Sequence, residues 1–507
     1  MKKYIIIIST ALALINSSSC SERDLELLPP SADYASNINT ESKLQQILTG
    51  AYFSVASSSA FGTDLLVFGD ILGDKIYNTP SRALFIQTYE YNYNANQNQF
   101  GFYGTLYSAI VSSNIVINNT LVPNSDATAK IKGQAKILRA LSYFTLVNYY
   151  SASPTSGLNQ EYGVPLVLTD YDVTIQPARA TVAEVYNQII KDLTEGMNQT
   201  SGVNAKVLLG SNAAKLLLSR VYLTRRAAGD AQLALQYSNE LIASANSSYV
   251  SNDPITDPNN TRPNPFIPSK DIPAANYSNY FKGSDDAFSE GHPETLWELD
   301  LTQLNNAVTG IGANGALPVY YSAGDNTRRS LLANKTFFES FGSFLDVRRG
   351  GTATNINTGL FSDQARTADS PLGYWINKYP KFSSSGNFTR DIKILRYSEA
   401  YLNRIEALRL LNQTDLALTE LNAFAASRKG LTYSGTDLLS DILTERSKEF
   451  YGEGQRFLDL KRYNLSVNRP SNCNTCKLDA TDNRFVLPLG QNAINQNPNL
   501  KQYPGYN

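Results

Sequence analysis

The sequence predicts a mainly α-helical fold with long loops and a few short strands. Three observations indicate this class: apolar residues recur at steps of three and four toward both ends of the chain, two segments have the pattern of helical hairpins, and a loop-rich stretch separates these hairpins. With 42% hydrophobic residues among 507, the chain can bury a large core. The formal net charge is -1 and no basic stripe is present, which argues against a nucleic-acid partner.

The N-terminus has the layout of a lipoprotein signal peptide over residues 1–19. Lys2 and Lys3 precede an apolar stretch of about twelve residues, which is shorter than the roughly twenty that a membrane-spanning helix requires. Small residues then lead into Cys20, as they do where a signal peptidase cleaves and the new N-terminal cysteine is acylated. We therefore expect a lipid anchor at Cys20 and a polar, proline-ended tether over 20–30. The alternative is ordinary secretion with an incidental cysteine.

Helical periodicity is clear in three segments of the N-terminal part. Apolar steps of three and four predict a helix directly after the tether, in TESKLQQILTGAYFSV, with Ser42 and Gln45 as a candidate capping box. A second helix is predicted over 133–150, where apolar residues share one broad face. A third helix is predicted to begin at Thr181, because Glu184 stands at capping-box spacing from it.

Two further segments have the length and the turn residues of helical hairpins. In 213–242, Gly229 is expected to end the first helix in the left-handed conformation, and Asp230 is expected to cap the second. In 396–430, the corresponding turn and stop residues are Asn412, Thr414 and Gly430. Each unit is about 30 to 35 residues long, close to a tetratricopeptide unit. Because roughly 150 residues separate them, we expect a stacked helical scaffold with a long insertion.

The insertion spans about 246–330 and differs in composition from the rest of the chain. Residues 251–280 are rich in Pro, Asn and Ser and follow neither helical nor strand periodicity, so a loop is predicted. Residues 294–301 alternate enough for a short strand, in which we expect Trp297 to be packed rather than to face a ligand. The stretch 310–330 again has an irregular pattern.

Few residues in the sequence offer metal or redox chemistry. Four oxygen-bearing side chains lack the spacing of an EF-hand calcium loop: Asp253, Asp257, Asn259 and Asn260. Cys473 and Cys476 form a CxxC motif, but a chain with three cysteines and one histidine is poorly supplied for a complete zinc site. In an oxidising compartment we expect these two residues to form a local disulfide that pins a loop, with two free thiols as the alternative. No metal or other cofactor is expected.

Candidate catalytic groups are equally few. The single histidine, His292, argues against a Ser-His-Asp or Cys-His nucleophile. A carboxylate pair needs no histidine, and Glu449 and Glu453 lie four residues apart. Arginines and an aspartate surround this pair in the sequence, so a structural ion-pair network is a better interpretation than an acid and base couple. We expect no enzymatic activity.

The stretch ERSKEFYGEGQRFLDLKRY, residues 445–463, resembles the C-terminal signature of the SusD/RagB family. In that signature a Glu-Arg start, a Glu-Gly turn, an Arg and an Asp-Leu-Lys-Arg end recur in this order. Gln455 stands where the family often has His, and Phe457 stands where it often has Trp. Further segments agree in the family's order and extend the resemblance over essentially all of the mature chain: 133–151, 163–168, 179–193, 213–223, 396–408 and 485–506.

The resemblance implies both a fold and a role. The fold is SusD-like, a single domain over 31–507 in which loops and short strands pack over tetratricopeptide-like helix pairs, with a helical part over about 31–245 and a C-terminal part over about 331–507. Family members are outer-membrane surface lipoproteins, anchored by fatty acyl chains such as palmitate, that bind glycans or other nutrients without cleaving them. They sit as a hinged lid on a SusC-like, TonB-dependent transporter, to which they deliver the nutrient.

We therefore expect a lipid-anchored protein at the cell outer membrane, exposed at the surface, that binds a glycan or oligosaccharide. Two other functions stay open. One is a surface glycoside hydrolase that uses a carboxylate pair, which would place two carboxyl groups within about 10 Å of each other in a cleft. The other is a helical scaffold lipoprotein that binds only protein.

The resemblance places ligand residues on loops early in the chain and in the central insertion. The early segment here is 68–103. In the family, an acidic loop in this position is followed by an aromatic and Asn pair. The nearest counterparts in this sequence are Asp74, Tyr89, Tyr91 and Asn94. Second-tier candidates in the central loop are Tyr320 and Tyr321. Sugar binding needs flat rings and planar polar side chains, and the early segment supplies both. The alternative is that these tyrosines belong to an edge strand or to ordinary packing.

Overall fold

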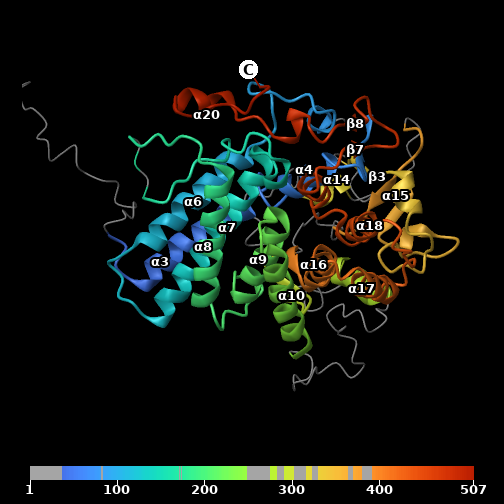
Figure 1. Ribbon diagram of the computed structural model, residues 1–507, viewed down its shortest axis with the longest axis horizontal. Coiled ribbons are helices and arrows are strands. Elements are labelled where there is room, and N and C mark those ends of the chain that lie inside the picture. The colour runs from blue at the N-terminus through green and yellow to red at the C-terminus, as the bar shows by residue number, and fades with distance from the viewer. Residues whose placement is uncertain are drawn as a thin grey trace, which may run out of the picture.

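Helices make up most of the described chain, and short strands lie between them (Figure 1). The computed structural model describes residues 37–80, 84–170, 172, 174–247, 274–282, 291–301, 316–321, 329–363, 369–379 and 391–506. The N-terminal helices lie on one side of the molecule and the C-terminal helices on the other. The mainly α-helical fold class is confirmed. The expected signal peptide, Cys20 and the tether lie outside the described residues.

Long helices that pack against their neighbours form the N-terminal side. They are α3 (Glu41–Ala56), α6 (Phe102–Asn118), α7 (Asp126–Tyr150), α8 (Val182–Gln199), α9 (Ser211–Arg225) and α10 (Asp230–Ser247). The packing of α7 against α8 requires a glycine, because a Cβ at Gly196 would lie 2.6 Å from Cγ1 of Ile137. The two backbones therefore approach closely, and the predicted apolar face of α7 is buried between its neighbours.

The starts of two helices test the capping predictions. Thr181 and Glu184 form the predicted capping box of α8, in which each side chain accepts the backbone N–H of the other residue. The capping box predicted at Ser42 and Gln45 is wrong. Thr40 is the N-cap of α3, because its hydroxyl stands one position before the helix and accepts a backbone N–H of the first turn, whereas Ser42 lies inside the helix.

The C-terminal side holds a second group of helices and most of the strands. Its helices are α16 (Tyr397–Leu410), α17 (Thr414–Ser427), α18 (Leu438–Phe450) and α19 (Arg456–Arg462). Leu235 and Ile242 of α10 pack against the apolar cluster that contains Leu402 and Ile405 of α16. The two predicted hairpins, α9 with α10 and α16 with α17, are therefore stacked on each other as expected.

The turn of the first hairpin differs from the prediction. Arg226 (φ 53°), and not Gly229, takes the left-handed conformation that ends α9. Gly229 is also left-handed (φ 86°), but it stands directly before α10. Asp230 is the first residue of α10 rather than its cap, and its carboxylate accepts from the Arg225 guanidinium and from the Ala227 N–H, both at 2.7 Å.

The turn of the second hairpin is closer to the prediction. Asn412 (φ 60°) takes the left-handed conformation between the two helices. Thr414 begins α17 without capping it. Gly430 donates its N–H to a carbonyl in the last turn of α17, as a stop residue would, while Lys429 (φ 56°) holds the left-handed position.

In the described ranges, short strands form one four-stranded antiparallel sheet and two strand pairs. The sheet has the order β1 (Ile76–Asn78), β3 (Leu331–Ala333), β5 (Tyr374–Ile376) and β4 (Phe361–Asp363). The pairs are β2 (Thr295–Leu299) with β6 (Ile392–Arg396), and β7 (Val467–Asn468) with β8 (Lys477–Leu478). The pairing of β2 with β6 ties the insertion to the residue directly before α16. It confirms the strand predicted within 294–301.

Short helices occupy the remaining connections. They are α4 (Asp64–Ile71), α5 (Ile86–Tyr89), α11 (Ala274–Lys282), α14 (Pro318–Tyr321), α15 (Lys335–Glu339) and α20 (Gln491–Gln496), with 3-10 turns η3 (Pro154–Ser156), η4 (Ile356–Thr358) and η5 (Asn483–Phe485). Part of α11 lies in 251–280 and α14 lies in 310–330, so the prediction of irregular structure is wrong for these residues. The candidate calcium ligands Asp253, Asp257, Asn259 and Asn260 lie outside the described residues.

The last residues of the chain return across the N-terminal helices, where Figure 1 shows α20 along one edge. The Leu487 N–H donates to the Tyr149 carbonyl at 2.8 Å, and the Gln491 N–H donates to the Ala95 carbonyl at 2.9 Å. Tyr93 donates its hydroxyl to the Arg484 carbonyl. The C-terminal segment therefore covers an edge of the N-terminal side.

Candidate functional site

The predicted ligand tyrosines of the early segment lie in the core. Tyr89 is 0% exposed and Tyr91 is 2% exposed. Their hydroxyls donate to the carbonyls of Asn472 and Leu72 at 3.0 and 2.6 Å, and the Arg469 guanidinium lies over both rings. Because protein atoms cover the ring faces, this arrangement corresponds to the packing alternative and not to a sugar platform.

The two carboxylates of the same segment, Asp70 and Asp74, are also enclosed. Burial raises the pKa of Asp70 to about 7, although the Tyr321 hydroxyl donates to its carboxylate at 2.8 Å. Burial acts on Asp74 in the same direction, but the positive charges of Arg456 and Lys75 outweigh it and hold the pKa of Asp74 well below its usual value. Asp74 is therefore a structural partner of Arg456, at 2.7 Å.

The remaining predicted ligand residues divide between the core and the surface. Tyr320 is 7% exposed and packs edge to face on Phe85 at 4.9 Å between ring centroids, and Tyr321 is fully buried. Asn94 is exposed, and its Oδ1 accepts the backbone N–H groups of Asn96 and Gln97, both at 2.9 Å. Of the six predicted residues, only Asn94 therefore presents its side chain to solvent.

Cys473 and Cys476 form the local disulfide that was expected. The loop that it closes rests on the early segment, because Glu90 accepts the backbone N–H groups of Asn474 and Thr475 at 3.0 and 2.6 Å. The disulfide therefore supports a contact between the two ends of the chain.

Glu449 and Glu453 belong to a buried ion-pair network, as the sequence suggested. Glu449 pairs with Arg396 at 3.0 Å and with Arg428 at 3.4 Å. Glu453 pairs with Arg396 at 2.9 Å and with Lys378 at 2.8 Å. Burial would raise the pKa of Glu449, but the surrounding arginines hold it well below its usual value. A carboxylate held in this way stays ionised and cannot serve as a general acid.

The two arginines nearest to Glu449 and Glu453 in the sequence pair with other carboxylates in the fold. Arg446 pairs with Asp459 at 3.0 Å, and Arg456 pairs with Asp74.

His292 is buried, and its Nδ1 accepts the Glu294 N–H at 3.0 Å. Within the described ranges, no group of three or more His, Cys, Asp or Glu side chains is placed to hold a metal ion. No helix in the described part of the chain is both long and apolar enough to cross a membrane.

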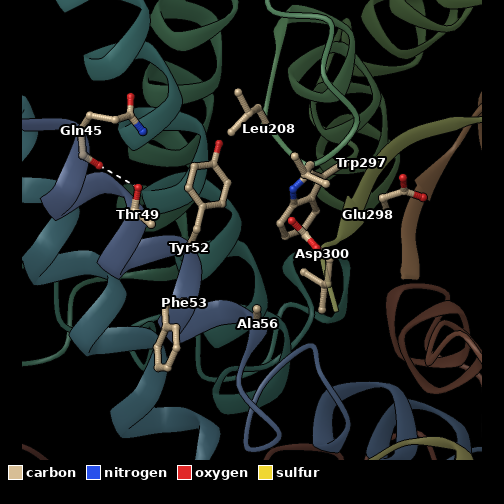
Figure 2. Close-up of a pocket in the computed structure, with 11 residues that line it drawn as sticks. Gln45, Thr49, Tyr52, Phe53, Ala56, Leu208, Trp297, Glu298 and Asp300 are labelled. Carbon is tan, nitrogen blue, oxygen red and sulfur yellow. Dashed lines mark hydrogen bonds between the residues drawn. The ribbon is translucent and has the colours of Figure 1, made fainter. Parts of the chain in front are cut away.

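A pocket of about 200 Å³ opens between α3, residues 207–208 and β2, and we name it the α3–β2 pocket (Figure 2). On α3 its lining residues recur at helical steps and so share one face: Gln45, Thr49, Tyr52, Phe53 and Ala56. Leu208 covers one end, and the residues from Trp297 to Asp300 form the opposite wall. The pocket therefore depends on a contact between the N-terminal helices and the insertion.

Two aromatic side chains of α3 differ in how firmly they are held. The Tyr52 hydroxyl donates to the Gln134 side chain at 3.1 Å and accepts the Leu209 N–H at 2.8 Å. Burial raises the pKa of this phenol, so it stays neutral and keeps both bonds. Phe53 is 37% exposed and stands outside the buried face of α3.

Trp297 is packed, as predicted, but it also forms a wall of the pocket. Its side chain is 1% exposed, and it meets Phe61 edge to face. The indole N–H has no hydrogen-bond acceptor among the described residues. Figure 2 shows the indole nitrogen on the side of the ring toward Tyr52 and Leu208. The sequence carried no signal for this, because a strand pattern predicts burial and not the surroundings of a single polar atom.

The two carboxylates at the pocket have different surroundings. Glu298 points away from Tyr52 in Figure 2, and it is bound by the Lys393 ammonium at 2.5 Å and by the Gly291 N–H at 2.6 Å. Asp300 lies at the pocket side of the same strand end and is only partly buried. Since one of the two carboxylates is held in a buried ion pair, the pocket does not present a carboxylate pair of the kind used in glycoside hydrolysis.

Comparison with known proteins gives two family matches. Residues 25–223 match a family described as starch-binding and associating with the outer membrane, and residues 345–506 match the SusD family. Together the two matches cover more than half of the chain. A SusD-like protein of Bacteroides ovatus is 24% identical over 497 residues, which cover 91% of this chain and 82% of that protein.

Solved structures agree with these matches over almost the whole chain. A SusD superfamily protein of Bacteroides thetaiotaomicron is 26% identical, with a TM-score of 0.75 over 92% of this chain and 100% of that one. The surface glycan-binding protein A of the same species is 17% identical, with a TM-score of 0.68 over 92% of this chain and 99% of that one, and shows the shared fold. On these matches, the chain belongs to the SusD/RagB family.

Proposed function

We propose that this protein is a non-catalytic cell-surface lipoprotein that binds a glycan or oligosaccharide and delivers it to a SusC-like, TonB-dependent transporter of the outer membrane. The main support is the match to the SusD family and to the starch-binding, outer-membrane-associated family, which together extend over both ends of the chain. Structural relatives that are described as glycan-binding cover 92% of the chain with the same fold.

The state of the acidic residues favours binding over hydrolysis. A glycosidase needs one carboxyl group that can donate a proton and a second one within about 10 Å, both open to the substrate. Glu449 and Glu453 are ion-paired within a buried network, and Glu298 is bound by Lys393. Asp70 has a raised pKa, but it is 2% exposed beneath Tyr321 and so is closed to a polymer.

A lipid anchor at Cys20 is the proposed attachment to the membrane. The described chain starts beside α3, so a tether from Cys20 would leave the helical body in water next to the bilayer. Mass spectrometry of the mature N-terminal peptide is expected to find an acylated Cys20, and a Cys20→Ser variant is expected to move into the soluble fraction. An unmodified Cys20 on a freely soluble protein would contradict the anchor.

One assay distinguishes the proposed function from its alternatives. The full chain is incubated with a panel of polysaccharides, and both retention of the glycan and release of soluble products are measured. Retention without products supports the proposal. Products would instead support the surface hydrolase, and neither retention nor products across the panel would leave the protein-binding scaffold.

Delivery needs a separate test, because retention does not identify a partner. Affinity purification of the full chain from outer-membrane extracts is expected to recover a TonB-dependent barrel in stoichiometric amount. Recovery of the lipoprotein alone, from membranes in which the barrel is present, would contradict the proposed partner.

A further inference from the structure

We infer that the α3–β2 pocket is a subsite for a single pyranose ring, to which the Trp297 indole donates a hydrogen bond. The inference rests on the proposed function and adds to it a location, a ligand size and a donor. Both the shape of the pocket and the chemistry of its walls support it.

The size of the pocket sets the size of the ligand. Its volume is about 200 Å³, whereas pockets for drug-sized ligands are roughly 300–1,000 Å³. One sugar ring fits the smaller space, and a disaccharide does not. The ring would be a terminal residue or a single branch of a glycan whose remainder lies outside the pocket.

The walls suit the two faces of a pyranose, which are largely made of C–H groups. Tyr52 and Trp297 stand on opposite sides of the pocket, and Phe53 lies on the same helix one position beyond Tyr52 (Figure 2). The rings of Tyr52 and Phe53 are at least partly open and can cover a C–H face of a bound sugar. Trp297 is 1% exposed, so it contributes the ring edge that carries its N–H and not a stacking face. Phe53 is not needed for the core, because the buried face of α3 consists of Leu44, Leu48, Ala51, Val55 and Ala56.

A polar group without a partner lies in the wall of this space that Trp297 forms. A buried N–H without an acceptor is destabilising, and the Trp297 indole N–H has no acceptor among the described residues. A hydroxyl or ring oxygen of a bound sugar would provide the acceptor. An aliphatic or aromatic side chain of a partner protein would fill the same walls and leave the N–H unbonded, so the sugar is the better occupant.

The other polar side chains lie where sugar hydroxyls need them. Thr49 donates its hydroxyl to the Gln45 carbonyl at 2.9 Å, so its oxygen can accept from a ligand. The Gln45 amide and the Asp300 carboxylate line the same opening. Tyr52 is held by two hydrogen bonds, so this wall is ordered before the ligand arrives, which lowers the entropic cost of binding.

The two tryptophans of the chain allow a direct test. Trp375 is buried in β5 and is not part of the pocket, so its indole N–H is an internal control. Proton–nitrogen spectra of the full chain are recorded during titration with glucose, galactose, mannose, xylose and N-acetylglucosamine. At least one sugar is expected to shift the Trp297 indole signal in a saturable way, with a Kd on the order of 1 mM, and to leave the Trp375 signal in place.

Two variants separate the donor from the ring. Trp297→Phe keeps an aromatic wall and removes the N–H. Because this variant lacks the indole signal, its sugar binding is followed by the backbone amide signals of α3, and we expect it to be about tenfold weaker while the Trp375 signal reports an intact fold. Phe53→Ala is expected to weaken binding at least about threefold. Phe344→Ala, a matched loss of an exposed ring outside the pocket, is expected to leave binding unchanged.

The outcomes also separate this inference from the proposed function. If the wild type retains a polysaccharide but the Trp297 signal is unmoved by each of the monosaccharides and by that glycan, the subsite is refuted and the proposed function stands. If indole or phenylalanine amide shifts the signal and sugars do not, the pocket receives a protein side chain, which also refutes the subsite. If the protein retains no glycan of the panel, the proposed function itself fails.

Discussion

The two sides of this molecule have different interiors. In the N-terminal helices the interior is mostly apolar, as in α7, where Ile137, Leu138 and Leu141 are buried among their neighbours. In the C-terminal part, Arg396 and Arg428 are buried at 1% exposure or less, each in contact with carboxylates. Apolar contacts have no preferred direction and tolerate small shifts, whereas each buried charge requires a particular partner. The charged side should therefore be the more sensitive to a single change.

Removing one cation from the charged interior should have the largest effect. Arg396→Met leaves Glu294, Glu449 and Glu453 without one of their cations, and an uncompensated buried charge is destabilising by about 3–5 kcal/mol. Urea unfolding measures this loss. The control is Arg404→Met, which breaks a half-exposed pair with Glu420 and should change stability by less than about 1 kcal/mol. Equal losses in the two variants would contradict the contrast between interior and surface charges.

A cavity in the apolar interior should have the next largest effect. Leu138 is 0% exposed, and Leu138→Ala is expected to lower the free energy of unfolding by about 3 kcal/mol. The loss should be the same at pH 5 and pH 8, because no titrating group is removed. A loss that varied strongly with pH would show that the cavity also disturbs the buried Arg139–Asp192 pair between α7 and α8.

The last expected effect is on the pH dependence of stability and concerns Asp70, a carboxyl that stands apart from the ion pairs. Its pKa is raised to about 7 by burial, whereas aspartate in an unfolded chain titrates near 4. Between these pH values the folded protein holds a proton that the unfolded chain has lost. The stability that this proton confers is complete below about pH 4 and is lost as the pH rises toward 7.

In Asp70→Asn this loss should be absent, so the stability difference between pH 4.5 and pH 7.5 should shrink by up to about 3 kcal/mol. The control is Asp74→Asn, four residues later in the sequence. The pKa of Asp74 is lowered, so its contribution persists above about pH 4 and is lost only in stronger acid. An Asp70→Asn variant with the pH profile of the wild type would show that Asp70 does not titrate in this range.

Features that depend on neighbouring residues were predictable from the sequence. The periodicity of α7, the capping box of α8 and both hairpins follow from contacts within about four residues. The cap of α3 was misplaced because three consecutive residues, Thr40, Glu41 and Ser42, carry hydroxyl or carboxylate groups. Of these, only Thr40 stands directly before the helix, and it is the residue that caps it.

Features that depend on distant residues were not predictable in the same way. Arg396 pairs with Glu294, which lies 102 residues earlier, and no local pattern links them. The tyrosines of the early segment have the composition of a sugar site, but their hydroxyls find carbonyl acceptors elsewhere in the fold. The α3–β2 pocket joins Tyr52 to Trp297, and its unpartnered N–H is visible only once the chain is folded.

The return of the C-terminal segment across the N-terminal helices limits where the chain can be truncated. Leu487 and Gln491 bond to backbone carbonyls near α7 and α5, and Tyr503 accepts the side-chain amide of Asn159. An isolated N-terminal fragment would expose this edge to water. We therefore expect that a newly made chain completes its interior only when its final residues have been added.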